Sequence, residues 1–307
     1  MCTMTSLATL VDDYRAHLKS SKKRSPLTLQ AYLGTITKFS ACLSEGMGTD
    51  VEDIRPRHLR DWLGGYMEQG KTSSAKTYYE RLRSFFNWCV REEELTKSPL
   101  AKVDPPQHNE EAPEIMPEDE VRSLIKACDV PLAKNASSVR FDNARDTALI
   151  RLMLDIGPRA SETAGILLDN IDLKAPSIRI VGKGGKVRTL PLGVKAENAL
   201  RKYLRLRKKH RHADSPFLFL GQRGALGYHG IWAIVDRRAR AGRIRHIRPH
   251  VLRHTFAHYF RLFEGSEGDL MYLGGWSRRE MVDRYAMTGA QVRAHAAHKI
   301  HSPGDHF

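Results

Sequence analysis

The sequence predicts a mainly α-helical protein with a small β-sheet, divided into two domains. Apolar residues recur with helical spacing over most of the 307 residues, and one short stretch has the pattern of a β-hairpin. An acidic, proline-rich stretch separates two patterned blocks, as a linker between domains does. Strand and helix signals do not alternate regularly, which argues against a parallel α/β sheet.

Residues 1–97 are predicted to form a small helical domain. Apolar stripes indicate four helices, and Pro26 and Pro56 mark two helix starts, where the missing N–H of proline is not needed. Aromatic residues such as Phe85 and Phe86 lie on these stripes. We therefore assign them to the core of the domain rather than to base stacking.

Residues 98–116 are predicted to be a linker. Prolines at positions 99, 105, 106 and 113 cannot lie inside one continuous helix. Residues 101–120 contain seven acidic side chains and one basic side chain, so this stretch would be repelled by nucleic acid. It is therefore expected to connect the domains without binding a polyanion.

Residues 117–290 are predicted to form the second, larger domain, and residues 291–307 a C-terminal tail. Two β-prone runs, residues 177–181 and 187–191, flank a glycine-rich turn and predict the hairpin. The rest of the domain has helical periodicity, and Gly157 ends the first long stripe.

The net charge of +15 is concentrated in the second domain. Residues 121–307 carry 34 basic and 16 acidic side chains, a surplus that is typical of proteins that neutralise phosphates. An ordinary basic protein, or one that binds RNA or anionic lipid, remains possible on charge alone. No apolar run approaches the ~18 residues of a membrane span, and the first residues do not resemble a signal peptide. Four scattered cysteines predict free thiols, so we expect a cytoplasmic protein with no membrane association.

Several residues of the second domain have side chains suited to chemistry. Arg159 lies between a helix end and a helix start, where an anion is readily bound. Lys183 lies at the hairpin tip between glycines, and His250 and Arg253 share one helix face. Each has an ordinary alternative as a solvated surface residue, and Tyr285 alone could equally be a packing residue.

Histidines recur at every fourth position from 246 to 258, which raises the possibility of a metal site. No cysteine or carboxylate complement accompanies this row, and Arg253 lies beside it. We therefore expect no metal and no cofactor.

Taken together and in their order, these stretches resemble the tyrosine recombinase (phage integrase) family, and the resemblance covers nearly the whole chain. Each motif is weak alone, but their order and spacing are specific. The matching stretches are Arg159-Ala160-Ser161-Glu162 (R-x-S-E), Gly182-Lys183-Gly184 (the hairpin lysine), His250-Val251-Leu252-Arg253-His254 (H-x-L-R-H), and Trp276 nine residues before Tyr285.

Two positions depart from the family pattern. Ile156-Gly157-Pro158 replaces the common T-G-L before the arginine, which alters the turn but keeps Arg159. Trp276 occupies the position of the usual second histidine, as in Cre-like members, and an indole can donate a hydrogen bond but cannot titrate. The first stripe begins near the N-terminus, so the chain resembles a simple Xer/Cre-like form without an arm-binding domain.

The resemblance implies a helical, SAM-like core-binding domain followed by an α/β catalytic domain. It implies a site-specific DNA recombinase or integrase, acting in phage or mobile-element integration through a 3′-phosphotyrosine on Tyr285. Arg159 and Arg253 would clamp the phosphate, and Lys183 would be the general acid. His250 would manage protons or bind phosphate. Trp276 would donate to the phosphate or pack against it, and Glu162 would orient the cluster.

The implied partners are double-stranded DNA core sites, three further copies of the chain in a homotetramer on DNA, and a directionality factor. The tail after residue 290 would be exchanged between protomers. Two alternatives remain at this point, a type IB topoisomerase and a DNA-binding regulator without catalytic activity. The bacterial cytoplasm is the expected location.

Overall fold

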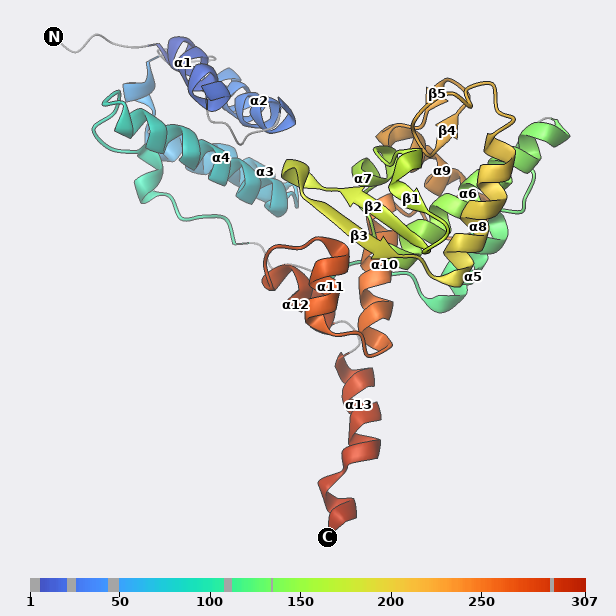
Figure 1. Cartoon of the computed structure of the whole chain (residues 1–307). Helices are drawn as coiled ribbons and strands as arrows, with labels where there is room; N and C mark the ends of the chain where they lie inside the picture. The colour runs from blue at the N-terminus through green and yellow to red at the C-terminus, as the bar shows by residue number, and fades with distance from the viewer. Residues whose placement is uncertain (1–5, 21–25, 44–49, 108–111, 134, 288–289) are drawn as a thin grey trace. The chain divides into compact units, whose positions relative to one another are not determined.

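The computed structural model describes residues 6–20, 26–43, 50–107, 112–133, 135–287 and 290–307. Its contacts divide the chain into two compact units, Met1–Glu110 and Glu111–Phe307. Both are built mainly of helices, and the small sheets lie in the second unit (Figure 1). The predicted fold class, mainly α with a small β-sheet, is therefore confirmed.

The first unit is a small bundle of helices. Phe39, Phe85 and Phe86 are at most 1% exposed, which agrees with their assignment to the core. Pro56 is the first residue of its helix, as predicted. The elements are α1 (Leu7–Ser20), α2 (Pro26–Leu43), η1 (Val51–Asp53), α3 (Pro56–Glu68), α4 (Thr72–Arg91) and η2 (Pro99–Lys102).

The boundary between the units falls inside the stretch predicted as a linker. Both ends of that stretch are packed against the units. Leu100 and Val103 are buried in the core of the first unit, where the carbonyl of Val103 accepts a hydrogen bond from Tyr79. Met116 is buried in the second unit, and its N–H donates to Thr255 Oγ1 at 3.0 Å.

The second unit combines the long helix α6 with other helices and a three-stranded sheet (Figure 1). α6 packs against α8 and α10, whereas β2 contacts α7 and β3 contacts α11. The helices are α5 (Glu118–Ala127), α6 (Ala136–Ile156), α7 (Ala160–Ala164), α8 (Val194–Arg207), α9 (Tyr228–Ala241), α10 (Pro249–Leu262), α11 (Glu267–Gly274), α12 (Glu280–Met287) and α13 (Ala290–His301), with short η3 (Leu168–Asn170) and η5 (Pro303–His306).

The predicted hairpin is present as strands β2 (Ser177–Val181) and β3 (Val187–Pro191), which pair antiparallel. The turn between them is η4 (Lys183–Gly185). The two-residue strand β1 (Ile171–Asp172) extends the sheet in the order β1-β2-β3. A second small pair, β4 (Leu220–Gly221) and β5 (Gly224–Ala225), was not predicted, because two-residue strands are too short to show alternation.

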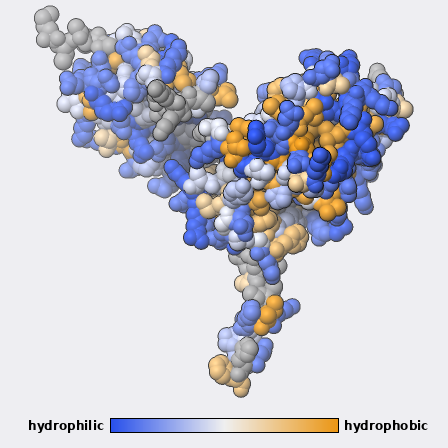
Figure 2. All heavy atoms as spheres, viewed as in Figure 1, coloured by the Kyte–Doolittle hydropathy of each residue, from blue (hydrophilic) through white to orange (hydrophobic). Residues whose placement is uncertain are grey.

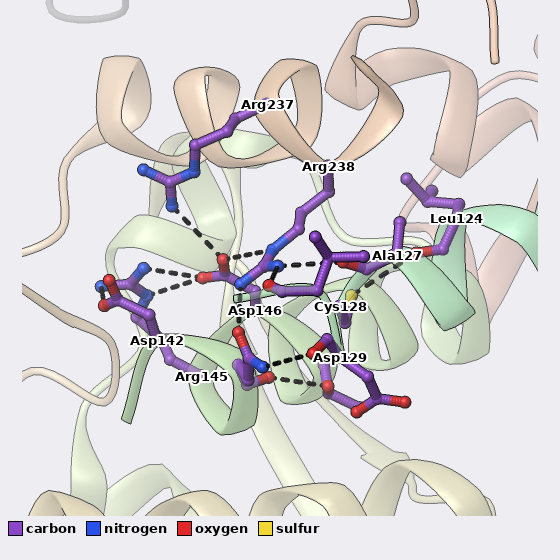
Figure 3. Close-up of polar contacts among 12 residues, drawn as sticks. Leu124, Ala127, Cys128, Asp129, Asp142, Arg145, Asp146, Arg237 and Arg238 are labelled. Carbon is purple, nitrogen blue, oxygen red and sulfur yellow. Dashed lines mark hydrogen bonds and ion pairs between the residues drawn. The ribbon is translucent and has the colours of Figure 1, made fainter. Parts of the chain in front are cut away.

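A buried ionic network joins α5, α6 and α9 (Figure 3). Asp146 of α6 is fully buried and accepts hydrogen bonds from Arg145 at 2.8 Å and from Arg238 at 2.7 Å. Arg238 also donates to the carbonyls of Ala127 and Val130, at and just after the C-terminal end of α5. Because the carboxylate is paired on both oxygens, its burial is compensated.

Hydrophobic residues are buried in both units, and some also gather on the face of the second unit seen in Figure 2. Each main core contains one cysteine, Cys89 in the first unit and Cys128 in the second. Burial raises the pKa of both thiols to about 12, whereas Cys42 is exposed. Cys2 lies outside the described residues. Among the described helices, none combines the length and apolarity that crossing a bilayer requires.

Candidate active site

Arg159 is held in place by the turn between α6 and α7. Gly157 ends α6 in the left-handed conformation, with φ of 57°, and Arg159 follows as the N-cap of α7. Its backbone N–H donates to Glu162 Oε2 at 3.0 Å, and its guanidinium donates to Glu162 Oε1 at 2.7 Å. The Arg159 side chain remains 35% exposed, so it can still reach a ligand.

Glu162 joins two arginines. It accepts from Arg159 and, at 2.8 Å, from Arg188 of β3. Burial opposes its ionisation, but hydrogen bonds from Arg188 and Arg159 outweigh this effect and lower the pKa of Glu162. Arg188 is buried and also donates to the carbonyl of Leu273 in α11 at 3.0 Å. Glu162 therefore connects α7 to the sheet and, through Arg188, to α11.

The hairpin tip lies beside a pocket of about 460 Å³. Arg159, Glu162, Lys186 and Trp276 are among the residues that line it. Lys183 lies in the turn η4, but its side chain is outside the described part of the structure. The predicted role of Lys183 as general acid therefore stays a prediction. The exposed Lys186 borders the pocket.

Arg253 is almost completely buried, with 1% exposure. Its two terminal nitrogens donate to the carbonyls of Gly157 at 2.6 Å and Gly274 at 2.7 Å. The guanidinium also stacks on the ring of Trp276, 4.1 Å from the ring centroid. Burial, followed by the charge of Arg159, lowers the pKa of Arg253 to about 10, so it remains charged at neutral pH.

His250 and His254 lie one turn apart on α10. Their ring centroids are 4.3 Å apart in an edge-to-face arrangement. Burial, then the charges of Arg253 and Arg159, lower the pKa of His250. The charges of Arg253 and Arg159 therefore both disfavour protonation of His250.

Tyr285 of α12 contacts this cluster through His254 and Trp276. Its hydroxyl lies 2.5 Å from Nδ1 of His254, and its ring centroid is 5.5 Å from that of Trp276. Only 3% of Tyr285 is exposed. Burial raises its pKa, although Arg253, Arg284 and Arg159 act in the opposite direction.

The structure thus gathers six of the seven residues predicted to form the site, and the position of the Lys183 side chain is not described. The six are Arg159, Glu162, His250, Arg253, Trp276 and Tyr285. Two further residues, Arg188 and His254, are in direct contact with them. The spacing of the motif indicated His254, because it lies four residues after His250 on the same helix face. No motif indicated Arg188.

The row of histidines from position 246 to 258 does not converge on one point. His246 bonds to Asp236 at 2.9 Å, whereas His254 bonds to Tyr285. Within the described ranges, no group of three or more histidine, cysteine or carboxylate side chains is arranged to hold a metal ion.

A buried tyrosine hydroxyl among arginines suits a covalent reaction with a phosphate diester, because the cations neutralise charge on the phosphate. On this helical fold with a hairpin beside the site, these features define the class of tyrosine site-specific recombinases. Comparison with known proteins gives the family. Residues 114–291 match the phage integrase family, and residues 11–93 match the phage integrase N-terminal SAM-like domain. The chain belongs to the phage integrase family.

Curated relatives are similar along most of the chain. Tyrosine recombinase XerC of Corynebacterium glutamicum is 29% identical over 300 residues, which cover 96% of this chain and 90% of the relative. XerC of Azotobacter vinelandii is 32% identical over 263 residues, covering 84% and 83%. The protein is therefore a tyrosine site-specific recombinase, as the sequence motifs predicted.

Solved structures share the fold. A XerH site-specific recombinase bound to a palindromic difH substrate has a TM-score of 0.73 and 20% identity, covering 94% of this chain and 84% of that one. A lambda integrase dimer bound to a core site has a TM-score of 0.71 and 18% identity, covering 92% and 77%. At these identities the likeness supports the fold, and the site residues rest on the geometry above.

Proposed function

We propose that the protein cuts and rejoins two double-stranded DNA core sites through a 3′-phosphotyrosine on Tyr285. One observation carries the proposal: the Tyr285 ring packs against Trp276, on which the Arg253 guanidinium lies, and the charges of Arg253 and Arg159 act on the Tyr285 hydroxyl. The phenol attacks the scissile phosphodiester and releases a 5′-hydroxyl. That hydroxyl then attacks the phosphotyrosine of the partner strand, so the bond energy is conserved and no ATP is needed.

The arginines supply most of the stabilisation of charge on the phosphate. Each terminal nitrogen of Arg253 uses one N–H for a backbone carbonyl, which leaves a second N–H for a phosphate oxygen. Arg159 is more exposed and is oriented by Glu162, so it can close on the other oxygen. Trp276 fixes the plane of Arg253 by stacking, and His250 donates to the phosphate or manages its protons.

Lys183 is proposed as the general acid that protonates the leaving 5′-oxygen. It lies in a turn whose glycines allow a close approach to a ligand, with φ of 74° at Gly184 and 76° at Gly185. Lys186, which borders the pocket, is the alternative donor at this hairpin. Comparing Lys183→Ala with Lys186→Ala in the cleavage assay below decides between them.

The proposal also includes the assembly of the protein on DNA and the direction of recombination. A solved lambda integrase structure is a tetramer on a Holliday junction, and we propose a homotetramer on paired sites for this chain. We also propose that a separate directionality factor sets the direction of recombination and that the protein acts on DNA in the bacterial cytoplasm. Integration of a phage or mobile element is the biological role proposed from the sequence. Sequencing the DNA trapped on the protein in cells distinguishes integration from resolution of plasmids or chromosomes.

The decisive test replaces Tyr285 by phenylalanine. On a nicked core-site substrate, the wild type should give a covalent complex on a denaturing gel, whereas Tyr285→Phe should bind DNA but give none. Tyr228→Phe, at an exposed position on α9, is the matched control and should behave as the wild type.

A covalent complex with Tyr285→Phe would refute the assignment of the nucleophile. Binding without cleavage by the wild type would instead support a DNA-binding regulator. Relaxation of supercoiled DNA that lacks core sites would support a type IB topoisomerase. The denaturing gel, the DNA-binding assay and the relaxation assay distinguish these three outcomes.

A further inference from the structure

The contact between His254 and Tyr285 has no role in the proposal above. The Tyr285 hydroxyl lies 2.5 Å from His254 Nδ1, so the two atoms are hydrogen-bonded. The rings also touch, with centroids 5.5 Å apart. His254 is half-buried on α10, one turn after His250 and next to Arg253. It therefore touches the atom that would attack phosphorus.

Burial and nearby charges set the protonation states of His254 and Tyr285. His250 and Arg253 face it from α10, and Arg284 and Tyr285 face it from α12. Burial, then the charges of His250, Arg253 and Arg284, lower the pKa of His254 to about 4. Burial raises the pKa of Tyr285 above its usual value. The imidazole is therefore neutral at neutral pH, and in the tautomer that carries its proton on Nε2, Nδ1 accepts the hydrogen bond of the phenol.

We propose that His254 is a catalytic residue that accepts the phenolic proton of Tyr285 during attack on the DNA phosphate, an inference that rests on the proposed nucleophilic role of Tyr285. As the Tyr285 oxygen bonds to phosphorus, its proton moves to Nδ1 of His254. The bond from phosphorus to the 5′-oxygen breaks, and that oxygen takes a proton from the general acid. In the rejoining step the 5′-hydroxyl of the partner strand gives its proton to the group that acted as general acid and bonds to phosphorus. The bond from phosphorus to the Tyr285 oxygen breaks, and that oxygen takes the proton back from His254.

The position of the tyrosine favours this role over that of a latch that keeps the nucleophile out of the site. Tyr285 packs against Trp276, which itself stacks on Arg253. The phenol is therefore already within the group that would hold the phosphate. His254 meets the hydroxyl from α10, the helix that also carries His250 and Arg253. A base on that helix keeps its place relative to the phosphate ligands.

The first test is His254→Asn. The asparagine Oδ1 occupies nearly the position of the imidazole Nδ1, so it can accept the hydrogen bond but cannot take up the proton. Single-turnover formation of the covalent complex should fall by about 10²-fold at neutral pH. His254→Gln, in which no acceptor occupies the Nδ1 position, should be at least as slow. His229→Asn, at an exposed position on α9, is the matched control and should keep the wild-type rate.

The pH profile separates proton transfer from positioning. His254 is neutral above a pKa of about 4, so the wild-type rate should not rise between about pH 6 and pH 9 through this group. In His254→Asn the proton must leave to solvent, and the rate should rise with pH. A 5′-bridging phosphorothiolate, whose sulfur leaves without a proton, should restore cleavage to Lys183→Ala but not to His254→Asn.

The outcomes are distinct from those that test the proposed function. A wild-type rate and pH profile in His254→Asn overturns the role of His254, and so does faster cleavage, which would indicate a latch. Rescue of His254→Asn by the phosphorothiolate also overturns it. A gel shift and a melting curve identify a variant that fails to fold, and His254→Gln then provides the second reading. A covalent complex in Tyr285→Phe would instead refute the nucleophile itself.

Discussion

Arg253 is fixed by groups from three parts of the second unit. Its guanidinium donates to the carbonyl of Gly157, just after α6, and to the carbonyl of Gly274, the last residue of α11. It also lies over the ring of Trp276, which follows α11 in the chain. A guanidinium can meet two carbonyls and a flat ring at once because it is planar and has several fixed N–H groups. An ammonium group cannot. The position therefore requires arginine for its shape as well as for its charge.

Arg253→Lys should reduce the rate of covalent complex formation by about 10²–10³-fold, because the lysine loses the two directed donors and the stacking. The rate is measured in single turnover on a nicked core site. Arg223→Lys, at an exposed position between β4 and β5, is the control and should leave the rate unchanged. Near-wild-type cleavage by Arg253→Lys would mean that charge alone is sufficient.

Gly157 and Gly184 form a matched pair for testing the turn before Arg159. Both have positive φ, so alanine at either costs about 1–2 kcal/mol in backbone conformation. Only at Gly157 would the new Cβ meet another group, Phe256 Cδ1 at 2.2 Å. Gly157→Ala should therefore lower the free energy of unfolding more than Gly184→Ala, as measured by urea denaturation. Equal losses in the free energy of unfolding would show that the Phe256 ring can move away from the new Cβ at little cost.

Most of the site residues could be predicted from the sequence, but Arg188 could not. Arg159, His250, Arg253 and Trp276 belong to motifs with fixed spacing, so their convergence with Tyr285 was predictable. Arg188 is one of several charged residues on a short hairpin, and its partners are distant in sequence. Its role follows from the strand register, which turns it inward between exposed neighbours Val187 and Thr189.

At the scale of elements, α6 is the centre of the second unit. Its apolar side chains pack against α8 and α10, and Asp146 connects it to Arg238 of α9. A carboxylate at this depth holds α9 in one position, because Arg238 also donates to carbonyls at and just after the end of α5. The geometry of the network limits how α5 and α9 can shift.

Asp146→Asn should lower the free energy of unfolding by about 3–5 kcal/mol, because it leaves buried arginines without their anion. Thermal and urea denaturation of the full chain measure the effect. Asp214→Asn, at an exposed position, should have little effect and serves as the control. A loss as small as that of Asp214→Asn would mean that solvent or backbone carbonyls compensate Arg145 and Arg238.

Long elements were predictable and short ones were not. The stripe that ends at Gly157 and the helix that starts at Pro249 were found from periodicity and from helix-ending or helix-starting residues. Strands β1, β4 and β5 have two residues each, which is too short for a periodic signal, whereas the five-residue strands β2 and β3 were found on either side of their glycine-rich turn. Tertiary hydrogen bonds stabilise the two-residue strands, for example that of Leu220 N–H to the Tyr203 hydroxyl.

At the scale of the whole molecule, the two units have separate hydrophobic cores, each with its own set of helices. The C-terminal helix α13 presents exposed side chains among its described residues, including His295, His298 and Ile300. An exposed apolar side chain such as Ile300 on a terminal helix is suited to contact with another copy. The proposed exchange of the tail between protomers uses this helix.

Removing residues 290–307 should leave binding to a single core site unchanged but abolish the complex that contains two paired sites. Gel shifts with one and two sites, together with the mass of the complexes by light scattering, measure the two steps. Removing only residues 303–307 keeps α13 and is the control. If the longer truncation still pairs sites, the tail is not the link between protomers.

Each unit has a buried cysteine whose chemical modification would report the unfolding of that unit. A thiol that is inaccessible and has a pKa near 12 reacts with an alkylating reagent only while its surroundings are open. Cys89 therefore records opening of the first unit, and Cys128 that of the second. Mass spectrometry of the alkylated peptides, with and without DNA, would give two separate protection factors from one unmodified chain. Comparing them would reveal which unit the DNA stabilises.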